Sequence, residues 1–244
     1  MKELIFDEND SIGEQTLDAI SDADKFNDWM YNTIKPFSKG KILEIGSGIG
    51  NISNSFIEDD KSIMLSDIRE GYCARLEKKF LNKKSFLGTQ VMNLTDPNFE
   101  TEFKDQLETF DTVFALNVVE HIYDDSLAIK NAKKLLKKGG HLIILVPSYN
   151  SLMNGFDKEL GHYRRYNKKS LSLLFKENQF EIIHSQYFNF MGIFGWYVSG
   201  NILKNDTIPK GQMNLYNTLV PLFKLVDKLM FKQVGLSTIL VGKK

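Results

Sequence analysis

An apolar segment that runs into three closely spaced glycines is the feature that most restricts the fold of this chain. Residues 43–51 read LEIGSGIGN, with glycine at positions 46, 48 and 50. Glycine lets the backbone turn tightly and approach a ligand, and a helix that begins at such a turn directs free N–H groups at that ligand. The segment therefore predicts a strand, a ligand-binding turn and a helix. Its G-x-G-x-G spacing differs from the G-x-G-x-x-G of dinucleotide-binding turns.

The rest of the chain alternates between short apolar runs and segments with a helical spacing of apolar residues. Strands are predicted at 41–46, 61–67, 85–93, 110–117, 139–147, 180–188 and 235–244. Helices are predicted at 14–36, 50–58, 69–81, 98–108, 123–138 and 168–179. Strands that alternate with helices of about 10 to 15 residues indicate an α/β fold with a doubly wound, mostly parallel sheet.

Two segments interrupt this alternation. A long polar connection covers 148–167, and an apolar insertion with an amphipathic helix at 215–231 covers 189–234. Long connections on a rigid sheet are where ligand sites tend to lie. For 244 residues we expect a single domain. Its expected parts are an N-terminal helical cap, a core sheet and a helical insertion that serves as a lid or an oligomer surface, at 1–39, 40–188 with 235–244, and 189–234.

Charge and cysteine content exclude several classes of protein. Lys and Arg total 31, as do Asp and Glu, so the chain has no overall basic field and we expect no nucleic-acid partner. Cys73 is the only cysteine, and the N-terminal MKELIFDENDS lacks the apolar run of a signal peptide. Both features favour a cytoplasmic location. Residues 185–203 are uncharged over the length of a membrane span, but polar residues and glycines interrupt them, so we expect a strand followed by the insertion.

Polar side chains at the ends of the predicted strands indicate which ligand the turn holds. Glu44 precedes the first glycine, where a carboxylate suits a cationic amine and repels a pyrophosphate. Asp67 closes the second strand, 21 residues after Gly46, where an acid accepts both hydroxyls of a ribose. Asn93 ends the third strand, where it can meet an adenine amino group, and Asn117 ends the fourth, over the switch point of the sheet. S-adenosylmethionine, which has an α-amino group and no pyrophosphate, suits this set.

Four segments together resemble the class I S-adenosylmethionine-dependent methyltransferases. They are the glycine turn LEIGSGIGN (43–51), the acid-bearing LSDI (65–68), the strand and loop FDTVFALNVVEHI (110–122), and LLKKGGHLIILVP (135–147). The resemblance covers about 40–188 and the final strand. It implies a Rossmann-like seven-stranded sheet with an antiparallel last strand, in which 180–188 and 235–243 form the closing hairpin.

The resemblance also assigns residues to the cofactor and its product, S-adenosylhomocysteine. Those it implies are Glu44, Gly46, Ser47, Gly48, Asp67, Ile68, Asn93, Leu94 and Asn117. The glycine turn would line the methionine part, with Glu44 ordering the turn or the amine. Asp67 would bind the ribose, and Ile68 and the 93–94 pair would surround the adenine. The family more often has aspartate where this chain has Asn93.

The segment that follows the fourth strand supplies the first catalytic candidate, His121. Residues 117–121, NVVEH, resemble the E-x-x-E-H of ubiquinone-pathway and small-RNA 2′-O-methyltransferases, in which two glutamates and a histidine hold a divalent metal. Asn117 stands where the first glutamate would be, which removes a hard carboxylate ligand, so we expect no metal. The alternative is structural: Glu120 caps the following helix and His121 packs beneath it.

The long connection supplies the second candidate, His162, as a base or as a group that orients the substrate. The pattern PSYNSL…D…GHYRRYNKKSL looks like a bacterial methyltransferase subgroup often linked to glycan or lipid assembly. Asp157, Tyr163, Arg164 and Arg165 are candidates to grip a polar or anionic headgroup. The alternative is a loop bonded to itself, with Asp157 paired to an arginine.

These observations favour a methyltransferase that acts on a small molecule, with oxygen as the acceptor atom. The expected acceptor is a lipid-, quinone-, phenol- or saccharide-linked metabolite. The apolar insertion is compatible with a lid, with peripheral membrane contact or with a homodimer surface. The alternatives are an RNA 2′-O-methyltransferase, a non-catalytic cofactor-binding scaffold and a nicotinamide oxidoreductase. The oxidoreductase has little support, because the spacing of the glycines differs from that of dinucleotide-binding turns. In addition, the only Tyr-x-x-x-Lys, Tyr31 to Lys35, precedes the first strand, where a dehydrogenase would not place it.

Overall fold

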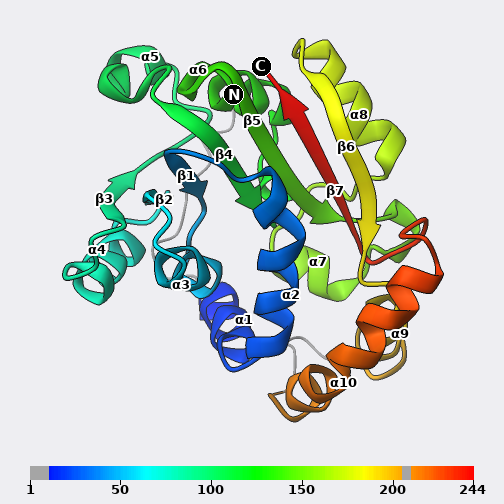
Figure 1. The fold of residues 1–244 in the computed structure, drawn as a ribbon. Helices are drawn as coiled ribbons and strands as arrows, with labels where there is room; N and C mark the ends of the chain where they lie inside the picture. Colours follow the sequence, from blue (N-terminus) through cyan, green and yellow to red (C-terminus); the bar gives the residue numbers. More distant parts are fainter. Residues whose placement is uncertain (1–10, 205–209) are drawn as a thin grey trace.

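A single mixed β-sheet forms the centre of the molecule (Figure 1). The structure, a computed structural model, describes residues 11–204 and 210–244. Within these residues the sheet has seven strands in the order β3-β2-β1-β4-β5-β7-β6. Its strands are β1 (Ile42–Ile45), β2 (Ile63–Asp67), β3 (Phe86–Val91), β4 (Phe110–Leu116), β5 (Leu136–Pro147), β6 (Glu181–Phe188) and β7 (Ser237–Lys243). Strands β1 to β5 pair in parallel and β7 runs antiparallel to both neighbours, which confirms the predicted Rossmann-like fold class.

Helices cover both faces of this sheet because successive strand residues point to opposite sides. In β1, Ile42 belongs to an apolar core that includes residues of α2 (Asp24–Ile34), α3 (Asn51–Glu58), α4 (Glu70–Phe80) and α10 (Lys210–Leu229). Its neighbour Leu43 packs on the other face with α5 (Phe99–Glu102), α6 (Asp125–Leu135) and α8 (Lys168–Glu177). Both side chains are fully buried. The sheet therefore lies between two apolar cores, as expected for a doubly wound fold.

The N-terminal segment differs from its prediction. The single helix expected at 14–36 is divided into α1 (Ser11–Ser21) and α2, with a break at Ala23. The Asn27 side-chain amide donates to the carbonyl of Ile20 at 3.0 Å and so satisfies a group that the break leaves open. The break lets α1 turn over the glycine turn, where Asn51 donates to the carbonyl of Leu17 at 3.2 Å.

Two other predicted elements also have different boundaries in the structure. The predicted helix at 98–108 is only α5 followed by a 3-10 turn at Lys104–Gln106. The strand expected from 139 begins at Leu136, because Leu136 already pairs with Phe110 of β4 before the register shifts. The preceding helix, α6, consequently ends at Leu135.

The insertion at 189–234 packs onto the body of the molecule. It contains α9 (Gly192–Tyr197), a π-helical turn (Val198–Ile202) and α10. Val220 and Phe223 of α10 enter the core beside α2. Asp227 accepts hydrogen bonds from the backbone N–H groups of Asn189 and Phe190, both at 2.7 Å. Within the described residues, no helix is both long enough and apolar enough to cross a membrane.

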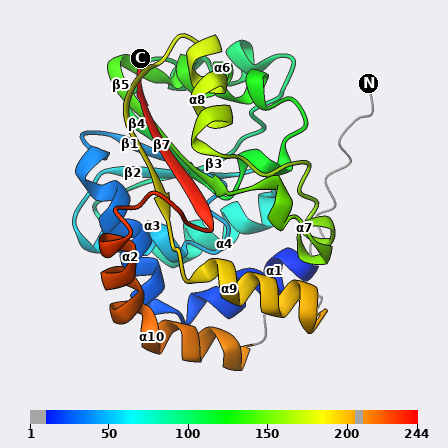
Figure 2. The same cartoon turned by 90° about the vertical axis from the view of Figure 1, so that its right-hand side faces the viewer.

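The arrangement of the connections determines where a ligand can bind. The carboxyl ends of the parallel strands point toward α1, α9 and α7 (Gly155–Glu159), which gather at one end of the sheet (Figures 1 and 2). The strand order reverses between β1 and β4, so the loops after these two strands diverge and leave a crevice. The segments singled out in the sequence follow β1, β2, β3, β4 and β5 and therefore meet at this end.

Candidate functional site

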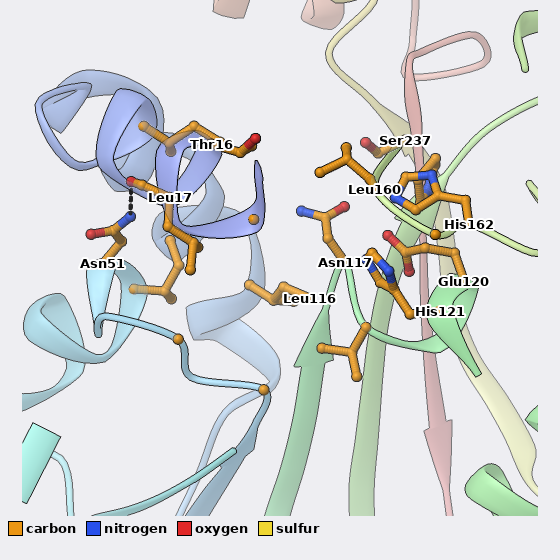
Figure 3. A pocket seen from close by; sticks show the side chains of 18 of the residues that line it. Thr16, Leu17, Asn51, Leu116, Asn117, Glu120, His121, Leu160, His162 and Ser237 are labelled. Atoms are coloured by element: carbon orange, nitrogen blue, oxygen red, sulfur yellow. Dashed lines mark hydrogen bonds between the residues drawn. The ribbon is translucent and has the colours of Figure 1, made fainter. Parts of the chain in front are cut away.

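A cavity of about 660 Å³ lies at the carboxyl end of the sheet. One wall is the glycine turn with the ends of β2 and β3, and another is formed by residues 117–122 and 159–165. Helices α1, α2, α9 and α10 supply apolar side chains to the remainder. Figure 3 shows Thr16, Leu17 and Asn51 on one side of this space, with Asn117, Glu120 and the two histidines across from them.

The glycine turn has a conformation that other residues adopt only with strain. Gly46 and Gly48 have φ values of +71° and +53°. A Cβ at Gly46 would lie 2.4 Å from Cγ2 of Val118, so the turn and the loop after β4 could not approach as they do. The Gly48 N–H donates to Oδ2 of Asp67 at 2.9 Å and ties the turn to the end of β2.

Two acids lie behind this turn with little exposure. Glu44 is 5% exposed, and its carboxylate accepts a hydrogen bond from the Ser53 hydroxyl. Burial and the nearby Asp67 raise the pKa of Glu44 to about 8, although hydrogen bonds from Ser53 and Ser47 oppose this shift. Burial also raises the pKa of Asp67, although the N–H groups of Arg69 and Gly48 oppose this shift. An ammonium group in the cavity would therefore gain from both acids, and ribose hydroxyls could donate to Asp67.

The opposite end of this wall suits a flat heteroaromatic ring. Ile68 and Leu94 line the cavity beside Asn93. The Asn93 Oδ1 already accepts from Thr95 twice, from its N–H and from its hydroxyl, each at 2.9 Å. Only the amide N–H groups of Asn93 therefore remain available. They can donate to a ring nitrogen of an adenine, but the side chain has no acceptor left for the adenine amino group.

The loop after β4 places a carboxyl group and two imidazoles together. Glu120 has no exposed surface, and neither of its carboxylate oxygens has a hydrogen-bond partner among the described residues. Burial raises the pKa of Glu120 to about 8. Asp124 caps α6 by accepting from the Leu127 N–H at 2.9 Å, so the alternative in which Glu120 caps this helix is wrong.

His121 and His162 face each other at this wall (Figure 3). Their ring centroids are 4.6 Å apart in an edge-on arrangement. Burial and the neighbouring His162 lower the pKa of His121 to about 3, so its imidazole is neutral. The ligand atoms of Glu120, His121 and His162 all lie within 4.8 Å of one another.

A buried ion pair between Asp157 and Arg165 lies next to His162. The Nδ1 of His162 is 2.7 Å from Oδ1 of Asp157, and the Nε of Arg165 donates to the same oxygen at 2.7 Å. The Arg165 guanidinium lies over the Trp196 ring of α9, 4.6 Å from its centroid. Hydrogen bonds from His162 and Arg165 lower the pKa of Asp157 despite its burial. Hydrogen bonds and an ion pair within the connection at 148–167 thus hold it together, as the alternative interpretation of the sequence predicted.

The structure brings most of the expected site residues to the cavity wall. All nine expected cofactor residues, both histidines, Tyr163 and Arg165 line it. Asp157 lies behind His162 without exposed surface. Arg164 is directed away, because it pairs with Asp125 Oδ2 at 2.8 Å and donates to the Tyr123 carbonyl at 2.6 Å.

Sequence reasoning expected the insertion as a lid among other roles, but it did not place the apolar side chains of α2 in the wall. Phe26 and Met30 of α2, Trp196 of α9, and Met213 and Tyr216 of α10 line the cavity. The helical spacing in α2 suggested core packing, and the break between α1 and α2 and the position of the insertion bring these side chains to the cavity.

The fold and this site define an α/β domain that binds a nucleoside-type ligand at the switch point of its sheet. Residues 24–185, more than half of the chain, match the family model described as "Methyltransferase domain", so the chain belongs to this family.

Individual relatives share less of the chain. A Penicillium polonicum protein named a highly reducing polyketide synthase is 28% identical over 123 residues, which is 49% of this chain and 5% of that protein. The chain thus spans only a small part of that relative.

Solved structures share the fold. A phosphoethanolamine N-methyltransferase of Haemonchus contortus, solved with S-adenosylmethionine, has a TM-score of 0.63 at 16% identity, over 100% of this chain and 61% of that one. A methyltransferase of Archaeoglobus fulgidus, described as SAM-dependent, has a TM-score of 0.58 at 14% identity, over 89% and 94% of the two chains.

Proposed function

We propose that the protein is an S-adenosylmethionine-dependent methyltransferase that acts on a hydroxyl oxygen of a small, largely apolar acceptor. The observation that carries this proposal is the single cavity that joins the glycine turn and its two acids to the Glu120–His121–His162 cluster. A methyl donor held at the first end would present its reactive group toward the second. The membership of the methyltransferase family supports the same reaction class.

The residues of the first end suit the cofactor. Asp67 offers acceptors to a ribose, Glu44 can ionise against an incoming α-ammonium group, and Asn93 with Leu94 suits an adenine ring. When bound, S-adenosylmethionine supplies a methyl group that the positive sulfur already activates. The protein is left with the tasks of aligning the acceptor and excluding water. The solved Haemonchus contortus relative, which holds this cofactor, has the same fold.

The second end suits an acceptor oxygen. His162 is held by Asp157, so its Nε2 has a fixed direction toward the cavity wall, where it orients the acceptor hydroxyl. His121 lies 4.6 Å away, ring to ring, and remains neutral, so it can accept a hydrogen bond from the same group. An imidazole in such a position can act as a general base that removes the proton of a hydroxyl group. A thiolate intermediate is unnecessary, and Cys73 is buried elsewhere, beside β3.

The rest of the wall favours an acceptor with an apolar or aromatic body. Phe26, Met30, Trp196, Met213 and Tyr216 line it from three helices. Tyr163 and Arg165 add polar groups near the histidines. A polynucleotide is disfavoured because the chain has no net charge. We place the acceptor among lipid-, quinone-, phenol- or saccharide-linked metabolites.

Calorimetric titration with S-adenosylmethionine, S-adenosylhomocysteine and NADH tests the cofactor assignment. Micromolar binding of the first two and none of NADH is expected. Asp67→Ala should weaken this binding by about 10- to 100-fold, because a hydrogen bond to a charged group contributes about 1.5–3 kcal/mol. Asp105→Ala, at an exposed position outside the cavity, is the control. Binding of NADH alone would exclude a methyltransferase, and binding of none would favour a scaffold.

Transfer of a ¹³C-labelled methyl group then identifies the acceptor atom. The acceptors to screen are phenols, lipid and glycolipid extracts, and a β-ketoacyl thioester, the last because the relatives include polyketide synthases. The chemical shift of the transferred carbon distinguishes oxygen, nitrogen and carbon acceptors. A label found only on carbon or nitrogen would contradict the proposed oxygen.

A further inference from the structure

Against the expectation from the sequence, which considered residues 117–121 alone, we propose that Glu120, His121 and His162 form a binding site for one divalent transition-metal ion at the acceptor end of the cavity. The binding of the ion is independent of the methyl donor. Its role, to hold the acceptor oxygen in place of the direct hydrogen bonds from His121 and His162, rests on the proposed function.

The positions of the ligand atoms carry the first step. One atom from each of the three side chains lies within 4.8 Å of the others. Ligand atoms that share an ion at about 2.0–2.2 Å are separated by about 3 to 4 Å. Small rotations of the three side chains would therefore close the set around one ion. The three residues come from two loops, after β4 and after β5, so the sheet fixes their relative placement.

The state of Glu120 carries the second step. Its side chain has no exposed surface, and both oxygens are without a hydrogen-bond partner in the part of the chain that the structure describes. A buried carboxyl group without partners is costly, and buried polar groups in native proteins nearly always have one. Arg165, the neighbouring cation, is engaged with Asp157 and with the Ser148 carbonyl at 3.1 Å. A bound cation would supply the missing partner of Glu120.

The partners of the two imidazoles carry the third step. His162 uses Nδ1 for Asp157, at 2.7 Å, which leaves Nε2. The backbone of Leu160 lies near His121 and favours its protonated form, although burial lowers the pKa of His121 overall. A metal-binding histidine typically donates its second nitrogen to a carboxylate or a backbone carbonyl, which fixes the ring for the metal. His162 has this arrangement.

The donor set indicates the class of ion. Two imidazoles and one carboxylate suit Mn²⁺, Fe²⁺, Co²⁺ or Zn²⁺, whereas Mg²⁺ and Ca²⁺ prefer oxygen ligands. Three protein ligands leave coordination positions open, and these positions face the cavity because all three residues line it. An oxygen bound there ionises more readily than it does in water.

Direct binding of Mn²⁺ and Zn²⁺ to the full chain, after dialysis against a chelator, tests the site without any substrate. Mn²⁺ binding is followed by the loss of the free-ion signal in electron paramagnetic resonance, and Zn²⁺ binding by calorimetry. We expect one ion per chain. Glu120→Gln and His162→Ala should each weaken binding at least tenfold. Asp157→Asn should weaken it by about 10- to 100-fold through the orientation of His162.

Matched controls separate the site from adventitious binding. Glu181→Gln removes an exposed carboxylate, and His184→Ala removes a histidine on β6, both outside the cavity. Neither should change the binding. Titration with S-adenosylhomocysteine shows that each variant is folded and, independently, whether the cofactor assignment holds. Absence of binding at millimolar Mn²⁺ and Zn²⁺, or equal binding by Glu120→Gln and the wild type, would overturn the metal site.

Discussion

Asp157 holds His162 through a 2.7 Å contact between Oδ1 and Nδ1, and the two side chains are 0% and 5% exposed. The Nε–H of Arg165 donates to the same Asp157 oxygen. A buried ion pair therefore holds the imidazole of His162 in place. Asp157 was expected to grip the substrate, and its burial makes it a positioning residue in our interpretation. The Nε2 of His162 therefore remains available to a ligand in the cavity.

This relationship predicts a separation of binding from turnover. Asp157→Asn should lower kcat by about 10- to 100-fold, because a neutral amide can present the wrong hydrogen-bonding group to Nδ1 and no longer fixes the ring. The affinity for S-adenosylmethionine should stay within about twofold, since Asp157 lies outside the wall formed by the glycine turn. Steady-state kinetics and calorimetry measure the two quantities. An equal loss of both would indicate that Asp157 supports the fold and has no special relation to His162.

A second prediction concerns the glycine turn. Gly46→Ala places a methyl group 2.4 Å from Cγ2 of Val118 at a positive φ, so it should destabilise the protein by about 1–3 kcal/mol and abolish cofactor binding. Gly211→Ala is the matched control, because it lies in α10 with nothing within 4 Å of the added carbon. That change should stabilise the protein by about 0.5–1 kcal/mol. Thermal melts and calorimetry check both variants, and a folded Gly46→Ala that binds the cofactor normally would contradict the packing argument.

The sequence was sufficient for those features that depend on neighbouring residues. Strands, the glycine turn and the acids at strand ends follow from local patterns, because the carboxyl ends of parallel strands always meet at one edge. Glu44, Asp67 and Asn93 therefore fall where they were expected.

The remaining features depend on contacts between distant segments. The burial of Asp157 requires Arg165 and Trp196, and the position of Glu120 at the cavity wall requires that Asp124 caps α6 in its place. The break between α1 and α2 is stabilised by the Asn27 side chain, which no periodicity of apolar residues could reveal.

A third prediction concerns the acceptor wall. Trp196 contacts the Arg165 guanidinium and the Phe156 ring, at 4.6 and 5.1 Å between centres, and donates to the Leu152 carbonyl at 3.2 Å. Trp196→Ala should raise KM for the acceptor about tenfold, because it removes a cation–π contact and part of the apolar wall. Cofactor affinity should be unchanged. Phe194→Ala, on the same short helix but 54% exposed, should change neither value. A similar KM for both variants would place the acceptor elsewhere.

The last prediction uses pH to test the state of Glu120 in protein stripped of metal. Its pKa is about 8 in the folded protein against 4.5 for the free group, so the folded state retains a proton that the unfolded state releases. Stability should therefore fall as pH rises from about 4.5 to 8, at up to about 1.4 kcal/mol per pH unit for this group. Glu44, whose pKa is also about 8, adds a second contribution over the same range.

Glu120→Gln removes the first contribution and leaves the second. Its melting temperature should exceed that of the wild type more at pH 8 than at pH 5, whereas the exposed-site variant Glu181→Gln should match the wild type at both. Adding Mn²⁺ at pH 8 should then stabilise the wild type and not Glu120→Gln, because the ion takes the place of the missing partner. An equal effect of Glu120→Gln at both pH values would mean that the carboxylate is already compensated by charge in the metal-free protein, and the case for a cation beside it would lose its main support.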